Sequence, residues 1–222
     1  MNDKRIRIII GHYGSGKTEF SINYAIKLKK QHEKVALVDL DVINPYFRSR
    51  LQESMLNEKG IAMIASNIKG SGSDLPAVSG GVLGPLQNQS TQVVLDVGGD
   101  STGARTLGRY EEYFQDGAYD MFCVVNVNRG QTETVEGILR NVYAIEKTSR
   151  AKVTGLINNT HLLRETTVED VLKGQKIVKQ AADKLGVPIR YVVALEEVAA
   201  SLPSNIEGEI FPIKLYMREK WM

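Results

Sequence analysis

The feature that most constrains this chain is a glycine-rich octapeptide near the start of the sequence. Residues Gly11–Thr18 read G-H-Y-G-S-G-K-T and match the pattern G-x-x-x-x-G-K-[ST]. They follow an apolar run at Arg5–Ile10 and open an amphipathic stretch at Lys17–Gln31, so they are expected to connect a strand to a helix. Glycines let backbone N–H groups converge on an anion, and the helix N-terminus adds a positive dipole. The pattern therefore predicts a phosphate-binding loop.

Two side chains of this loop have defined roles in such a site. Lys17 places an ammonium group on the β- and γ-phosphates of a nucleoside triphosphate, which makes it a predicted catalytic residue, and the Thr18 hydroxyl can ligate Mg²⁺. The nucleotide-binding residues predicted around the loop are Gly11, Tyr13, Gly14, Ser15, Gly16, Lys17, Thr18 and Glu19.

Short β-branched runs alternate with helical patterns along the chain. Strands are expected at Arg5–Ile10, Val35–Leu40, Ile61–Ala65, Val93–Val97, Met121–Val127, Val153–Asn158 and Ile189–Ala194. Helices are expected at Lys17–Gln31, Thr132–Glu146 and Val168–Leu185, the last of them stopped by Gly186 and Pro188. The alternation predicts a three-layer α/β P-loop NTPase fold with a mostly parallel sheet of about seven strands and helices on both faces.

Two segments have no clear place in this alternation. Residues 66–90 are rich in Gly and Ser and are expected to form a long loop with a short helix near Gly80–Gln87. Within that loop, Ser73–Pro76 could either close over a partner or form a turn. Residues 205–222 are expected to be a C-terminal tail that packs against the rest. The whole chain, 1–222, is then one nucleotide-binding domain.

Composition excludes several other classes of protein. The formal net charge is +2, with Lys and Arg spread along the chain, so no nucleic-acid partner is expected. The one cysteine, Cys123, cannot form an internal disulfide or supply a zinc site and is expected to be a buried thiol. The apolar run Ile6–Ile10 is too short for a signal peptide, and no stretch is long enough to span a bilayer. We therefore expect a cytoplasmic protein that does not bind membranes.

Acidic residues follow two of the expected strands. Asp39 and Asp41 close the run that starts at Val35, and Asp96 closes the run Val93–Val97, just before Gly98 and Gly99. In a parallel α/β sheet the carboxyl ends of the strands face the ligand. A carboxylate there can hold Mg²⁺ directly or through water. These residues could instead be turn or helix-capping residues, but their position downstream of the phosphate loop favours the functional interpretation.

At these residues the sequence resembles the MinD/ParA/CobQ-type ATPases, the deviant Walker A branch of P-loop proteins. Val38–Asp41, leading to Asn44-Pro45, is similar to that family's switch I. Leu95–Gly99 is similar to its Walker B and switch II segment, and Gly155–Asn159 resembles the strand that ends in a base-reading Asn. The resemblance covers roughly two thirds of the chain.

The resemblance implies a homodimer that sandwiches two ATP molecules with Mg²⁺ and uses hydrolysis to time its action on a protein partner. Asp41 would then position the attacking water, and Asp39 would support the magnesium ion. Asp96 would be the Walker B carboxylate, and Asn158 would contact adenine. Asn158 could equally be a turn residue after a strand.

The sequence departs from the family in one position of the loop. The family usually carries a second lysine near the start of the loop, which reaches across the dimer, and the corresponding residue here is His12. Arg105, Arg109 or Arg129 could supply a charge instead. The guanine-reading pattern N-K-x-D is absent from residues 158–161, which favours ATP over GTP. His32 and His161 stand apart from other potential metal ligands and are expected at the surface.

Three classes of function remain open at this point. An ATPase that regulates a protein partner or assists its maturation agrees best with the residues above. A small-molecule kinase, or an ATP-dependent ligase similar to dethiobiotin synthetase, would need a second substrate pocket. A nucleotide-binding module with negligible turnover is the third alternative.

Overall fold

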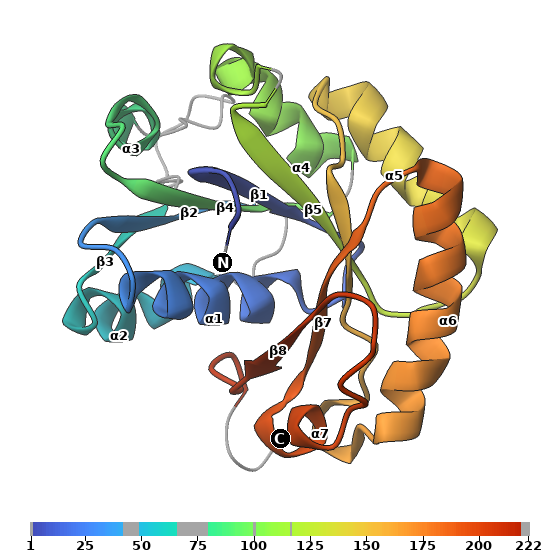
Figure 1. Ribbon diagram of the computed structural model, residues 1–222. Coiled ribbons are helices and arrows are strands. Elements are labelled where there is room, and N and C mark those ends of the chain that lie inside the picture. Colours follow the sequence, from blue (N-terminus) through green and yellow to red (C-terminus); the bar gives the residue numbers. More distant parts are fainter. Residues whose placement is uncertain (1, 42–48, 66–79, 100, 116, 219–222) are drawn as a thin grey trace.

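The computed structural model describes residues 2–41, 49–65, 80–99, 101–115 and 117–218. These residues form one parallel sheet of eight strands, in the order β3-β2-β4-β1-β5-β6-β7-β8 (Figure 1). The strands are β1 (Ile6–Ile10), β2 (Val35–Leu40), β3 (Ile61–Ala65), β4 (Gln92–Val97), β5 (Tyr119–Val125), β6 (Gly155–Asn158), β7 (Ile189–Leu195) and β8 (Glu209–Ile213).

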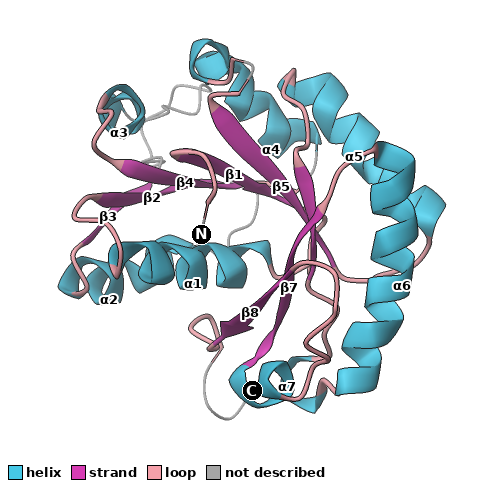
Figure 2. Cartoon of the chain, viewed as in Figure 1, coloured by secondary structure: helices cyan, strands magenta, loops and turns pink. Residues whose placement is uncertain are grey.

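Helices cover both faces of the sheet, which confirms the predicted three-layer α/β fold (Figure 2). One face carries α1 (Lys17–Lys29) and α2 (Glu53–Glu58). The other carries α3 (Leu83–Gln87), α4 (Ser101–Arg105), α5 (Val135–Ser149), α6 (Val168–Leu185) and α7 (Glu196–Ala200). The strands are buried on both sides, which explains their near-continuous apolar sequences.

The helix boundaries follow local capping chemistry. Helix α5 begins at Val135 rather than at the expected Thr132, because the Thr134 side chain accepts a hydrogen bond from the Gly137 amide and caps the helix. Helix α6 has its predicted bounds, with a capping box at Thr167 and a left-handed Gly186 after its end. Helix α1 ends at Lys29, two residues before the expected Gln31.

The long segment before β4 is described only in its second half. The expected short helix is present as a 3₁₀ turn at Gly80–Val82 followed by α3. Residues 66–79, which include Ser73–Pro76, lie outside the described residues. Between β2 and β3, helix α2 follows a 3₁₀ segment at Ser49–Gln52.

The expectation of about seven strands is corrected by an eighth, which lies inside the predicted C-terminal tail. Strand β8 pairs in parallel with β7, with Tyr191 opposite Glu209 and Leu195 opposite Ile213. It contains Pro212, which cannot donate to a strand ladder and argues against a central strand. Because β8 lies at the edge of the sheet, the proline is tolerated there.

Two further expectations concern burial and membrane contact. Cys123 is buried in β5, and burial raises the pKa of its thiol to about 12, as expected for a core thiol. No helix among the described residues has the length and apolar character needed to cross a membrane.

A buried acidic side chain near the start of the chain, that of Asp3, forms hydrogen bonds with residues of α1 and β7. The Asp3 carboxylate has an exposed fraction of 1% and accepts a hydrogen bond from Arg190 Nε at 2.5 Å. It also accepts hydrogen bonds from the hydroxyl groups of Tyr24 and Tyr191. These rings pack with Phe20 and Phe211 in one aromatic cluster under α1.

Replacing Asp3 with Ala should therefore destabilise the fold. The change leaves two buried hydroxyl groups and one guanidinium without their acceptor, so we expect the free energy of unfolding to fall by about 2–4 kcal/mol. Urea denaturation followed by circular dichroism measures this. Glu111→Ala is the matched control, because the Glu111–Arg150 pair is exposed and should contribute less than about 1 kcal/mol. Equal effects of the two substitutions would contradict this role for Asp3.

Candidate functional site

The phosphate loop connects β1, a central strand of the sheet, to α1. Gly14 and Gly16 have φ angles of 78° and 82°, in the left-handed region that favours glycine. A Cβ at Gly16 would lie 2.3 Å from Asn159 Nδ2, so a side chain there would also collide with the end of β6. The Ser15 amide donates to the His12 carbonyl at 3.0 Å and closes the turn. The loop is thus a tight turn that leads directly into the N-terminus of α1.

Lys17 is buried and forms an ion pair with Asp41. The Lys17 Nζ to Asp41 Oδ2 distance is 2.8 Å, and the two side chains have exposed fractions of 7% and 5%. Burial alone would lower the pKa of Lys17, but the nearby Asp96 and Asp41 carboxyl groups outweigh it and raise the pKa. The lysine therefore remains a cation at neutral pH. The structure brings these two predicted catalytic residues into direct contact.

Asp96 is fully buried, and neither of its carboxylate oxygens has a hydrogen bond of good geometry, although the Thr18 hydroxyl is close enough to lower its pKa. It lies on β4 directly opposite Asp39 of β2, so both side chains are at the carboxyl edge of the sheet. Burial raises the pKa of Asp96 to about 7, against the opposing charge of Lys17. A buried carboxylate without a well-formed hydrogen bond is rare and costly, which makes this oxygen pair a candidate ligand for a cation.

Asp39 and the glycines after β4 complete the phosphate side of the site. Asp39 Oδ1 accepts a hydrogen bond from the Asp41 amide at 3.0 Å, which fixes the backbone that carries Asp41. A Cβ at Gly99 would lie 2.0 Å from the Gly11 carbonyl oxygen. The chain after β4 therefore packs directly on the backbone of the phosphate loop, and only glycine fits at that contact.

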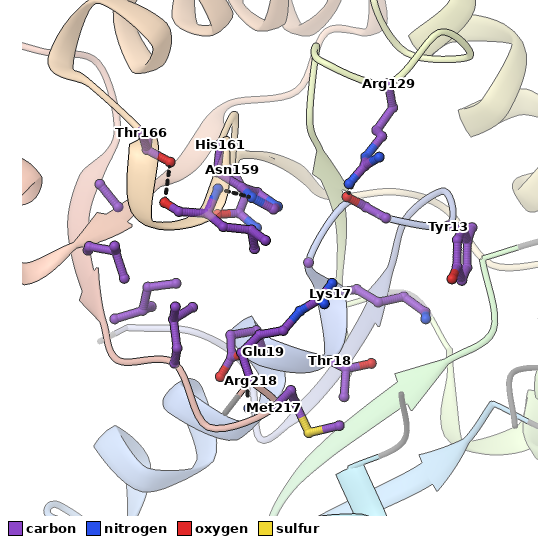
Figure 3. Close-up of a pocket in the computed structure, with 17 residues that line it drawn as sticks. Tyr13, Lys17, Thr18, Glu19, Arg129, Asn159, His161, Thr166, Met217 and Arg218 are labelled. Atoms are coloured by element: carbon purple, nitrogen blue, oxygen red, sulfur yellow. Dashed lines mark hydrogen bonds between the residues drawn. The ribbon is translucent and has the colours of Figure 1, made fainter. Parts of the chain in front are cut away.

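A cavity of about 310 Å³ opens beside the phosphate loop. Figure 3 shows Asn159 and His161 facing Glu19, Met217 and Arg218 across it. On the loop side it is lined by Tyr13, Gly14, Gly16, Lys17, Thr18 and Glu19. The other walls are formed by Arg129, Asn159, His161, Leu163, Thr166, Ala194, Leu195, Ile213, Leu215, Met217 and Arg218.

The two asparagines at the end of β6 have different surroundings. The Asn158 amide donates to the Val171 carbonyl and to Gln175, and its oxygen accepts two bonds from Thr160. Asn158 does not line the cavity, and its amide group is fully used inside the fold. Asn159 does line the cavity and donates from Nδ2 to the Ser15 carbonyl at 2.7 Å. The structure therefore does not bring Asn158 to the site and brings Asn159 in its place.

Glu19 connects the phosphate loop to the C-terminal segment. Its carboxylate oxygens accept hydrogen bonds from the backbone amides of Tyr216 and Met217, at 2.6 and 3.1 Å. Burial raises the pKa of Glu19 despite these hydrogen bonds. Glu19 therefore lines the cavity, and its carboxylate is occupied by protein backbone.

His161 is partly buried and lines the cavity, whereas a surface position was expected from the sequence. Its Nδ1 accepts a hydrogen bond from the Leu163 amide at 3.3 Å. Burial, together with the charges of Arg129 and Arg218, lowers the pKa of His161 to about 4. The ring is therefore neutral at pH 7.

Arg129 is the one of the three arginines considered above that lines the cavity. Its Nε donates to the Gly14 carbonyl at 3.2 Å, which holds the guanidinium against the phosphate loop. Arg105 and Arg109 lie on α4 and on the following 3₁₀ segment and do not line the cavity. His12 bonds to the neighbouring Tyr13 carbonyl through Nδ1 at 3.1 Å. The apolar wall residues belong to no motif, so they could not be recognised from sequence patterns.

This geometry agrees with the comparison of the sequence with known families. The family model CbiA, the CobQ/CobB/MinD/ParA nucleotide-binding domain, matches residues 6–202. The chain belongs to this family. Comparison with curated proteins gives no significant match. The family match makes the chain a P-loop nucleotide-binding protein and leaves β8 and the segment after it outside the matched range.

Solved structures show the same fold at low sequence identity. The cell division protein FtsY of Thermotoga maritima has a TM-score of 0.58 and 21% identity, over 86% of this chain and 62% of that one. FtsY of Mycoplasma mycoides has a TM-score of 0.58 and 18% identity, over 89% of this chain and 62% of that one. The signal recognition particle receptor FtsY of Elizabethkingia anophelis, in complex with GDP, has a TM-score of 0.55 and 18% identity, over 86% of this chain and 58% of that one. This chain thus spans less than two thirds of these proteins.

Replacing His161 with Asn should make the protein less sensitive to acid. An unfolded histidine titrates near pH 6.5, and folded His161 titrates near 4, so between these values only the unfolded chain takes up the proton. The free energy of unfolding therefore falls as the pH drops through this window, by up to about 1.4 kcal/mol per pH unit from this residue. Urea denaturation between pH 4 and 7 measures the slope. If the free energy of unfolding depends on pH in the same way in the wild type and in the variant, this effect is ruled out.

Proposed function

We propose that this protein is a magnesium-dependent ATPase that uses ATP binding and hydrolysis to regulate a protein partner or assist its maturation. The observation that carries the proposal is the fully buried Asp96 carboxylate, which has no hydrogen bond of good geometry and lies beside the Thr18 hydroxyl and the cationic Lys17. Such a carboxylate suits a ligand that brings its own cation, as Mg²⁺·ATP does. The family match supports nucleotide binding at this loop.

The residues present fit a magnesium ion that is shared with a nucleotide. Among the described residues, no group of three His, Cys, Asp or Glu side chains forms an all-protein metal cage. Mg²⁺ usually takes one or two protein oxygens and completes its shell with phosphate and water. The Thr18 hydroxyl and the Asp96 carboxylate would hold it, with support from Asp39. The bound ion would neutralise charge on the phosphates and thereby favour phosphoryl transfer.

Lys17 would bind the phosphates, and Asp41 would orient the attacking water. The Lys17 ammonium, held at neutral pH as a cation, would bind the β- and γ-phosphates and stabilise the charge that develops on them. This would take the ammonium from Asp41 and leave that carboxylate beside the γ-phosphate. There Asp41 would accept a hydrogen bond from the attacking water and orient it in line.

The cavity walls favour adenine over guanine. A guanine-specific site needs an acceptor for the N1–H and N2–H₂ groups of the base. Glu19 is the carboxylate that lines the cavity within the described part of the chain, and both its oxygens already accept backbone hydrogen bonds. Asn159 offers an amide group at the cavity wall, and we assign it the base contact in place of Asn158. Leu195 and Leu163 add apolar surface for the ring.

The protein partner and the homodimer remain part of this proposal. Tyr13, at the tip of the phosphate loop, has an exposed fraction of 63% and would be covered by a second subunit. His12 does not provide the second lysine of the family, and Arg129 would supply a cation to the phosphates from within the same chain. A charge supplied in this way allows hydrolysis without a residue that crosses the dimer.

Replacing Asp41 with Asn should separate binding from hydrolysis. The variant keeps the cationic Lys17 but loses the group that orients the water, so we expect phosphate release to slow by about 100-fold or more while ATP still binds. Light scattering and phosphate release, followed together after the addition of Mg²⁺·ATP, measure both effects. The wild type should dimerise and return to monomer as ATP is consumed, and Asp41→Asn should stay dimeric.

Lys17→Ala is the matched control, because it removes the other half of the same ion pair and should abolish triphosphate binding and dimerisation. Unchanged turnover in Asp41→Asn would show that the water is oriented by another group. Triphosphate affinity retained in Lys17→Ala would contradict the phosphate-binding role of the loop. A constant mass under all conditions would contradict the nucleotide-dependent dimer.

A further inference from the structure

The chain after β8 runs back across the start of α1 and is fixed there by two side chains of that helix. We call residues 214–218 the C-terminal strap. Glu19 accepts hydrogen bonds from the amides of Tyr216 and Met217 at 2.6 and 3.1 Å. Asn23, one helical turn further along, donates to the Lys214 carbonyl at 2.8 Å and accepts from the Lys214 amide at 2.9 Å.

The strap forms one wall of the cavity beside the phosphate loop. Leu215, Met217 and Arg218 line it, next to Ile213 at the end of β8 (Figure 3). Met217 and Tyr216 also pack against the aromatic core under α1. The opposite wall carries Asn159 and His161 (Figure 3), so the cavity is a slot between the strap and the end of β6.

The attachment links the strap directly to the phosphate loop. Glu19 immediately follows Lys17 and Thr18, so the residue that holds the strap is next in the chain to the residues that face the phosphates. All four hydrogen bonds go to strap backbone, which fixes the path of the strap whatever side chains it carries. Glu19 and Asn23 each have an exposed fraction of 9%, so the strap is attached to buried residues of the helix and not to its exposed surface.

We infer that the C-terminal strap is the base-binding wall of the nucleotide site, and that Glu19 and Asn23 are positioning residues that hold it beside the purine ring. The inference rests on the proposed function, because it assumes that the triphosphate occupies the phosphate loop. Leu215 and Met217 offer apolar and polarizable surface to a flat ring, and the Arg218 guanidinium lies at the same wall. The strap lies after residues 6–202, the range that the family model matches.

The test compares ATP with inorganic tripolyphosphate, which has the phosphates of ATP but no base. The affinities of both ligands, with Mg²⁺, are measured by isothermal titration calorimetry for the wild type, Glu19→Gln and Asn23→Ala. Each variant removes part of the backbone attachment, so we expect ATP to bind about tenfold more weakly and tripolyphosphate to bind as in the wild type. Circular dichroism of both variants confirms the fold, and two independent variants keep the test valid if one of them misfolds.

Lys27→Ala is the matched control, since Lys27 pairs with Glu209 and joins the same helix to β8 outside the cavity. It should leave both affinities unchanged. Unchanged ATP affinity in the two strap variants, or an equal loss of ATP and tripolyphosphate affinity, would overturn the strap inference and leave the phosphate-loop proposal standing. A wild type that binds neither ligand would instead overturn the proposed function itself.

Discussion

One lysine and three carboxyl groups meet in buried space at the carboxyl edge of the sheet, and the site is organised around this imbalance of charge. Lys17 is paired with Asp41 at 2.8 Å, while Asp39 and Asp96 lie side by side on neighbouring strands. Charges removed from water are costly unless they are paired. The cost of burying the Asp96 charge appears as a raised pKa. A cation bound with the nucleotide would offset the same cost by direct coordination.

The strand order is what creates this arrangement. Strand β1 delivers the phosphate loop, β4 lies beside it, and β2 lies beside β4, so the ends of three adjacent strands converge on one place. The contact of Gly99 with the Gly11 carbonyl then links the chain after β4 to the loop itself. On the far side, Asn159 and the C-terminal strap enclose the cavity. The residues proposed to hold the phosphates and the residue that holds the strap, Lys17, Thr18 and Glu19, are consecutive in α1.

The sequence allowed prediction of the fold and of the residues that meet around the glycine-rich loop, because both depend on local patterns. The glycine loop, the apolar strands and the acidic residues at strand ends are each visible within a few residues. The opposite side of the cavity depends on tertiary contacts between distant segments and could not be predicted in this way. At the end of β6, Asn158 and Asn159 differ by one position, and only the surroundings in the folded chain show which one faces the cavity.

The strand in the C-terminal segment was not predicted, for a related reason. Residues 209–213 form a strand only because the edge of β7 is available to pair with them, and Pro212 conceals the strand signal. His161 has no partner in the sequence that would mark it as a pocket residue, yet the loop after β6 places it beside Gly16. The structure of residues 209–213 and the position of His161 are both set by tertiary contacts and not by the neighbouring residues in the sequence.

The most direct test of this account is the magnesium dependence of ATP binding in the wild type and in Asp96→Asn, measured by titration calorimetry in Mg²⁺ and in EDTA. If Asp96 holds the magnesium ion, the wild type should bind ATP at least about tenfold more tightly with Mg²⁺, and Asp96→Asn should bind it equally in both conditions. A magnesium dependence that is unchanged in Asp96→Asn, or an absence of ATP binding by the wild type, would contradict the account.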